Sequence, residues 1–161
     1  MNLGDALPRI EATTDPAAMK TMTALLRDPN MIHLDPAVAE TLGFGPRVVV
    51  QGPILMGWLY TMLVRAAGGA DRLLDNRFRF RHAVFGGERV VTGGEVTAIS
   101  TRRGRPELGS PHGKRAVVAG QGAAGPGDVV ECTVWLDALR PEGPVRAVTG
   151  LARLMPAGGT R

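Results

Sequence analysis

One apolar segment, residues 54–67 (ILMGWLYTMLVRAA), constrains the fold of this chain more than any other feature. It follows Gly52-Pro53, and proline is favoured at the first position of a helix. Gly68-Gly69 comes directly after it and favours a helix end. A helix that is apolar nearly all round has no face for solvent, so it is expected to be buried. At about four turns, it has the right length to be wrapped by a single sheet.

The remaining elements are expected in a fixed order, with helices first and strands later. Asp15-Pro16 and Asp35-Pro36 each combine an N-cap with a proline at N1, which predicts helices over 16–26 and 37–42. A short strand is expected at 9–13. After residue 69 the hydrophobic period changes to two, which predicts strands over residues 77–85, 88–101 (with a bulge at Gly93-Gly94), 115–123 and 129–139. This order indicates the α+β class.

The first of these strands has an unusual polar face. Arginine alternates with apolar or aromatic residues, so a half-buried strand with a basic outer face is expected over Arg77, Phe78, Arg79, Phe80, Arg81, His82 and Val84. On this pattern His82 lies on the apolar face. It is therefore interpreted as a core or interface histidine rather than a catalytic one.

Length and composition favour one globular domain. The chain has 161 residues, of which 44% are hydrophobic and 21% charged, which is typical of a folded domain and not of a disordered chain. We expect a single domain over residues 1–140. Residues 141–161 are rich in Pro, Gly and Ala and are expected to form a flexible C-terminal tail.

The single cysteine and the hydropathy pattern restrict the compartment. Cys132 cannot form an intrachain disulfide or a cysteine-based zinc site, and it is expected to be a small core residue. The apolar stretch near residues 54–64 is too short to span a bilayer, and the N-terminus shows no secretory signal. We therefore expect a cytoplasmic protein with no membrane partner.

The charge balance favours an anionic partner. Lys and Arg total 19 against 15 Asp and Glu, giving a net charge of +4. Such a balance suits a nucleic acid or a phosphorylated small molecule. Aromatic residues make up only 4% of the chain, which argues against a base-stacking surface, so no nucleic-acid partner is expected.

The segment between the first two helices holds the candidate catalytic groups. Asp28 and His33 are five residues apart and would diverge in a straight helix or strand. They can converge only across an irregular turn, which Asp28-Pro29-Asn30 favours. A carboxylate and a neutral imidazole can then hold one water and move its proton near neutral pH. The alternative is that these are ordinary turn and surface residues.

The same segment carries a family resemblance. The pattern D-x-N-x-x-H-x-D-P-x-x-A is formed by Asp28, Asn30, His33, Asp35, Pro36 and Ala39, and it is followed by Phe44 and by Gly52 at the buried helix. This pattern resembles the hydratase signature of the MaoC-like family, which contains (R)-specific enoyl-CoA hydratases and 3-hydroxyacyl dehydratases. The strand region 78–96 is similar to the family less specifically, and the whole resemblance covers residues 9–139.

The resemblance implies a hotdog fold, in which a curved antiparallel sheet wraps one long buried helix. It also implies a homodimer or a higher oligomer, and a substrate that is an acyl thioester carried by CoA or pantetheine. It implies no cofactor and no metal. In the family pattern Asp28 and His33 bind and activate water, and the Gly52 N–H is the oxyanion donor.

Elementary chemistry agrees with that assignment. Addition of water to a 2-enoyl thioester develops negative charge on the thioester oxygen, and free N–H groups at a helix N-terminus stabilise such charge. Pro53 has no N–H, so the expected donors are Gly52 and Ile54.

Two positions depart from the family pattern. Gln51 stands where the family usually has histidine, and Met31 follows Asn30 where the family usually has proline. Gln51 can still hydrogen-bond and orient the loop, and we expect Asn30 and Gln51 near the substrate. The change at Gln51 leaves the substrate preference open.

Two basic residues further along the chain are candidates for the carrier. Arg102 and Arg103 could contact phosphates of CoA or of a pantetheine arm, or they could lie at a solvated hairpin tip.

Two other functions remain open on the sequence. A hotdog thioesterase would use a carboxylate on or near the central helix, but no Asp or Glu occurs between Gln51 and Ala70. A non-catalytic subunit of a heteromeric dehydratase is the other alternative, and the presence of both Asp28 and His33 argues against it.

Overall fold

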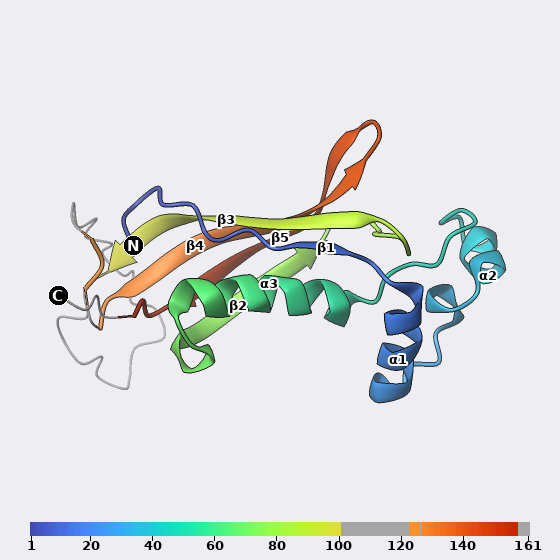
Figure 1. The fold of residues 1–161 in the computed structure, drawn as a ribbon, viewed down its shortest axis with the longest axis horizontal. Helices are drawn as coiled ribbons and strands as arrows, with labels where there is room; N and C mark the ends of the chain where they lie inside the picture. The colour runs from blue at the N-terminus through green and yellow to red at the C-terminus, as the bar shows by residue number, and fades with distance from the viewer. Residues whose placement is uncertain (101–122, 126, 158–161) are drawn as a thin grey trace, which may run out of the picture.

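The computed structural model describes residues 1–100, 123–125 and 127–157. Its elements in chain order are β1 (Glu11–Thr13), α1 (Pro16–Leu26), the 3₁₀ turn η1 (Met31–His33), α2 (Pro36–Thr41), α3 (Gly52–Ala67), η2 (Ala70–Arg72), β2 (Leu73–Phe80), β3 (Arg89–Ser100), β4 (Val129–Arg140) and β5 (Gly143–Leu154). Within the described residues the strands form one antiparallel sheet in the order β1-β3-β4-β5-β2 (Figure 1).

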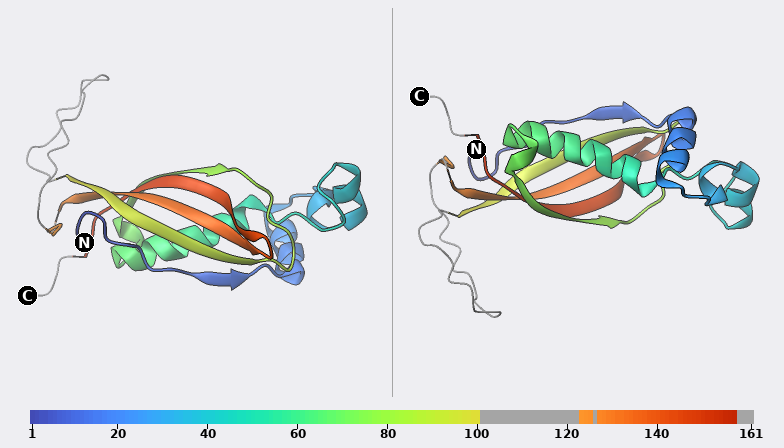
Figure 2. Two further views of the ribbon diagram at one scale, coloured as in Figure 1. Left: turned by 90° about the horizontal axis from the view of Figure 1, so that it is seen from above. Right: turned by 90° about the horizontal axis from the view of Figure 1, so that it is seen from below.

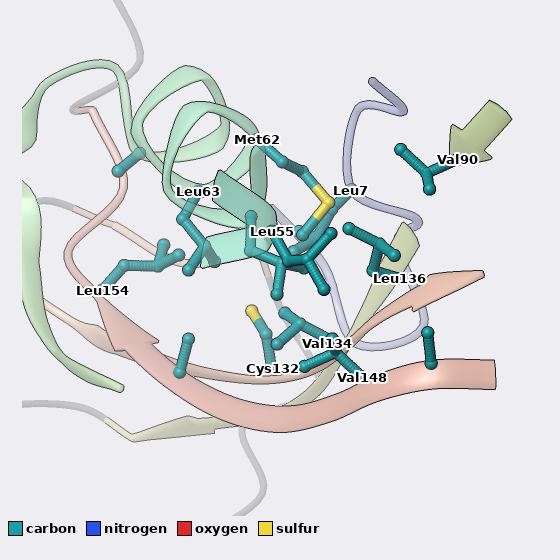
Figure 3. Packing of buried hydrophobic residues seen from close by; sticks show 14 of the residues in the cluster. Leu7, Leu55, Met62, Leu63, Val90, Cys132, Val134, Leu136, Val148 and Leu154 are labelled. Atoms are coloured by element: carbon teal, nitrogen blue, oxygen red, sulfur yellow. The ribbon is translucent and has the colours of Figure 1, made fainter. Parts of the chain in front are cut away.

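The sheet curls around α3, which lies on one of its faces, and no described element covers the other face (Figure 2). The buried side of α3 packs into the core with Leu55, Leu59, Met62, Leu63 and Ala67 (Figure 3). The prediction of an α+β hotdog arrangement is therefore confirmed. α3 is not buried all round, however, because the sheet covers one side only. An exposed row follows helical i, i+4 spacing along Pro53, Gly57, Thr61 and Arg65.

The helix ends follow the local signals in the sequence. The Asp15 side chain accepts a hydrogen bond from the Ala17 N–H, and Asp35 caps α2 through Ala37 in the same way, both at 2.9 Å. Each satisfies a donor that a helix start leaves unpaired. Gly68 ends α3 in the left-handed conformation, with φ of 79°.

The expectation of a flexible tail over residues 141–161 is wrong for residues 143–154. These residues form β5, which lies between β4 and β2. Two features hide its period-two pattern. The register shifts between β4 and β5 near Ala147, and Gly150 occupies an inward position where a Cβ would lie 2.6 Å from both Phe78 and the Arg77 carbonyl. Close packing requires a glycine at this position, but in the sequence that glycine resembles a loop residue.

Three further expectations change. β2 spans residues 73–80 rather than 77–85, so His82 lies beyond the strand and is exposed instead of facing the core. The irregularity of β3 falls between Val96 and Ala98, and not at Gly93-Gly94. Gly93 instead gives room to the Trp135 indole, since a Cβ there would lie 2.5 Å from its Nε1. The expected strand 115–123 lies outside the described residues, apart from residue 123.

No helix in the described part of the chain is long and apolar enough to cross a membrane.

Candidate active site

The Asp28–His33 segment is held in a tight bend by its own side chains. After α1 the chain reverses at Arg27, which has a left-handed φ of 52°. Asp28 Oδ1 then accepts from the Asn30 N–H at 3.1 Å, and Asn30 Oδ1 accepts from the Ile32 N–H at 3.3 Å. Two such successive turns are what Asp and Asn side chains favour. The side-chain oxygen of Asn30, expected near the substrate, thus caps the 3₁₀ turn of His33.

This bend brings Asp28 and His33 together, as expected from the sequence. His33 Nε2 lies 3.7 Å from Asp28 Oδ2, and the two side chains are 11% and 35% exposed. That separation exceeds a direct hydrogen bond but allows one water to contact both groups.

The other ring nitrogen of His33 identifies its tautomer. Nδ1 lies 2.6 Å from the Val49 carbonyl oxygen, which can only accept a hydrogen bond, so Nδ1 carries the proton. Nε2, the other ring nitrogen, faces Asp28. The Val49 N–H in turn donates to the Ile32 carbonyl at 2.9 Å, which fixes the backbone on both sides of the histidine.

A pocket of about 410 Å³ adjoins the first turn of α3. It is lined by Phe44, Val49, Val50, Gly52, Leu55, Phe80, Arg81, His82, Ala83 and Val84. Val49 links the two parts of the site, because its carbonyl holds His33 while the residue lines the pocket. Figure 1 shows α1 at the end of the sheet where α3 begins.

Gly52 offers a free donor at this helix start. Within the described residues its N–H has no hydrogen-bond partner. The Ile54 N–H, the second expected donor, already donates to the Gln51 carbonyl at 3.1 Å. A Cβ on Gly52 would lie 3.1 Å from the Phe80 ring, which shows how closely the pocket wall approaches the backbone here.

Gln51 is buried and ties the start of α3 to α1. Its Nε2 donates to the Met19 carbonyl at 2.9 Å and to Thr23 Oγ1 at 2.8 Å. Its Oε1 is buried and has no partner within the described residues. The Gln51 amide, expected near the substrate, is therefore engaged with α1, and Gln51 is not among the residues that line the pocket at Gly52. Arg102 and Arg103 lie outside the described residues.

A buried ion-pair network supports the pocket wall and was not anticipated from the sequence. Glu88 is only 8% exposed and accepts hydrogen bonds from Arg47, Arg140 and the Phe85 N–H. Arg140 also donates to the Ala83 carbonyl. The network thus holds residues 83–88, of which Ala83 and Val84 line the pocket. The partners in this network are far apart in the chain. The only local signal for it was an acidic residue, Glu88, directly after Gly86-Gly87.

Cys132 is excluded as a nucleophile. Burial and, to a smaller extent, the neighbouring Glu131 carboxylate together raise the pKa of its thiol to about 11. Three units below that pKa, at pH 8, only about one thiol in a thousand is ionised. We expect Ellman's reagent to leave the native protein unlabelled at pH 8 and to detect one thiol after denaturation. Rapid labelling of the native protein would contradict this burial.

Within the described residues no group of three His, Cys, Asp or Glu side chains is arranged to hold a metal ion.

The curled sheet around one helix, with a polar pair beside an apolar pocket, defines an α+β protein of the hotdog class. The family model described as MaoC like domain matches residues 4–110. The chain therefore belongs to the MaoC-like dehydratase family.

Solved structures show the same fold. The (R)-hydratase of A. caviae involved in PHA biosynthesis is 25% identical, with 97% of each chain covered and a TM-score of 0.70. The R-hydratase PhaJ1 of Pseudomonas aeruginosa is 17% identical, with 99% of this chain and 84% of that chain covered and a TM-score of 0.68. The HadBC complex of Mycobacterium tuberculosis, a 3R-hydroxyacyl-ACP dehydratase, matches at 14% identity over 96% of this chain and 97% of that chain, with a TM-score of 0.61. A comparison with curated proteins gave no match.

Proposed function

We propose that the protein is a hydro-lyase that reversibly adds water to a 2-enoyl thioester and dehydrates the corresponding 3-hydroxyacyl thioester. The observation that carries the proposal is the His33 imidazole, whose Nδ1 is committed to the Val49 carbonyl while Nε2 faces Asp28 at 3.7 Å. This geometry suits a general base with an oriented water. Family membership supports the same reaction class.

The proposed hydration step uses both members of the pair. A water held between His33 Nε2 and the Asp28 carboxylate gives a proton to Nε2 as its oxygen bonds to C3 of the substrate. The electrons of the C2–C3 double bond move toward the thioester oxygen and form an enolate. The proton then passes from Nε2 to C2, which restores the thioester carbonyl and neutral His33. Dehydration is the reverse sequence.

Gly52 is proposed to stabilise the enolate. Its N–H has no partner within the described residues and lies at the N-terminus of a 16-residue helix. Such donors and the helix dipole favour negative charge, and loss of one oxyanion donor typically costs about 10²–10³ in rate. The apolar pocket beside Gly52 is proposed to hold the acyl chain against Leu55 and Phe80.

The activity test is direct. Wild-type protein is incubated with crotonyl-CoA and with longer 2-enoyl-CoAs, and loss of the conjugated thioester absorbance is followed. Release of free thiol is measured in the same samples, because a thioesterase would break the thioester bond. Absorbance loss without thiol release supports the proposal. Thiol release from a saturated acyl-CoA would favour the thioesterase instead, although α3 carries no carboxylate.

We propose that the chain forms a homodimer or a higher hotdog oligomer, in a cytoplasmic setting that its single thiol suits. In the described residues β2 is an edge strand, and its Phe80 is 51% exposed. Open strand edges are commonly covered by a partner. The mass of the purified protein in solution tests this. A monomer would favour an unequal partner, and the dehydratase HadBC is itself described as a complex.

A further inference from the structure

Three arginines lie on β2 or directly after it. Arg77 and Arg79 lie on β2, Arg81 follows directly, and all three are exposed. Phe78, between the first two, points inward and packs edge-on against Tyr60 of α3, with 5.6 Å between the ring centroids. Because side chains alternate along a strand, Arg77 and Arg79 occupy the opposite face of the sheet. With the chain extended to Arg81, the three arginines span about 13 Å.

These arginines line a hollow rather than a flat surface. Together with Thr149, Gly150 and Leu151 of β5 they enclose about 310 Å³. In the sheet register Arg77 stands opposite Leu151 and Arg79 opposite Thr149. The Arg81 Nε donates to Thr149 Oγ1 at 3.2 Å, which fixes one guanidinium at the end of the hollow.

The charge of this hollow is uncompensated within the described residues. No carboxylate lies within ion-pair distance of Arg77, Arg79 or Arg81. Every arginine of strands β3, β4 and β5 has a carboxylate partner, in the pairs Arg89–Glu11, Arg140–Glu88, Arg146–Asp137 and Arg153–Asp75. The sheet therefore neutralises its arginines everywhere except on β2. Like charges side by side on one strand repel, and a bound anion removes that repulsion.

The hollow and the candidate active site share one lining residue. Arg81 lines both the hollow and the pocket at Gly52. If the acyl end of a thioester lies in the pocket, its carrier arm would pass Arg81 at the end of β2 to reach Arg77 and Arg79. A second copy pairing with the β2 edge would lie in the plane of the sheet and would not cover this face.

We infer that Arg77, Arg79 and Arg81 bind the phosphate groups of the carrier arm of the thioester substrate. This inference rests on the proposed function. Guanidinium groups bind phosphate through paired, charge-assisted hydrogen bonds, and no other described group of side chains near the pocket offers three uncompensated cations. CoA and a carrier-protein arm share a 4′-phosphopantetheine, and CoA adds a pyrophosphate linkage and a 3′-phosphate.

The test compares substrates with and without phosphate. The double variant Arg77→Gln/Arg79→Gln is assayed with crotonyl-CoA, crotonyl-4′-phosphopantetheine and crotonyl-pantetheine. Arg81 is left intact because it lines the pocket. Arg65→Gln is the matched control, since Arg65 is an exposed arginine near the opposite end of α3.

We expect the double variant to raise KM for crotonyl-CoA about tenfold, since each exposed ion pair contributes up to about a factor of five. The KM of the double variant for crotonyl-pantetheine should stay within about twofold of the wild-type KM. Added salt should raise the KM for crotonyl-CoA more in the wild type than in the double variant. If KM rises equally for crotonyl-4′-phosphopantetheine, the arginines bind the 4′-phosphate. If KM rises for crotonyl-CoA alone, they bind the phosphates that only CoA carries. Equal changes for all three substrates, or no change for crotonyl-CoA, would overturn the inference.

A binding measurement separates this inference from the proposed function. CoA is titrated calorimetrically into wild-type and variant proteins whose circular dichroism spectra match. If the wild type hydrates no thioester, the proposed function fails. CoA binding that is weakened about tenfold in the double variant, but not in Arg65→Gln, would still support the arginine site. CoA binding that is unchanged in the double variant would overturn it.

Discussion

Replacing His33 by alanine is expected to lower kcat for hydration of a 2-enoyl thioester by about 10²–10⁴-fold, the usual contribution of a positioned general base. Asp28→Asn is expected to cause a loss of similar order. The asparagine keeps a side-chain oxygen for the Asn30 N–H but removes the negative charge beside Nε2. Because both residues would act on one water, the double variant should be little worse than either single variant. Steady-state kinetics with crotonyl-CoA measures all three.

The control for these variants is Asp35→Asn. Asp35 lies in the same segment and caps α2 through the Ala37 N–H. Asparagine is an equally good N-cap, so this change should leave kcat near the wild-type value. If His33→Ala and Asp28→Asn keep wild-type activity, the assignment of the catalytic pair is wrong.

Removal of the Glu88 carboxylate is expected to lower the free energy of unfolding by about 3–5 kcal/mol, as is typical when one partner of a buried ion pair is lost. Glu88→Ala would leave the Arg140 guanidinium and the Phe85 N–H, both now bound to Glu88, without their acceptor. Urea denaturation measures the change.

An exposed pair of the same chemistry is the matched control. Glu11 binds Arg89 between β1 and β3, and their side chains are 62% and 64% exposed. Glu11→Ala should therefore cost less than about 1 kcal/mol. Equal losses for Glu88→Ala and Glu11→Ala would show that the Glu88 network does not stabilise the fold. A large loss would also be consistent with its support of the pocket wall at residues 83–88.

Much of the fold could be predicted because its signals are local. Asp15, Asp35 and Pro53 mark helix starts within one or two residues of where they occur, since caps act on the nearest N–H groups. The apolar content of residues 54–67 predicted the central helix in the same way. The meeting of Asp28 and His33 was also predictable, because the turn between them is made by Asp28 and Asn30 themselves.

Other features depend on residues that are distant in the chain. In the sequence, β5 resembled a flexible tail. Gly150 is needed for close packing against β2, and the register shift near Ala147 arises in the pairing with β4. Neither partner can be identified from the local sequence pattern. The prediction that His82 faces the core was wrong because β2 ends at Phe80, before His82.

By itself, the sequence determined the helix starts, the class of the fold and the turn that carries Asp28 and His33, because each depends on neighbouring residues. Only the tertiary structure decided that His33 donates to Val49, that Glu88 joins Arg47 to Arg140, and that the arginines of β2 meet no carboxylate among the described residues. Hydrogen bonds and ion pairs between distant segments form only when the sheet has closed around α3. Their partners are therefore chosen by packing and not by spacing along the chain.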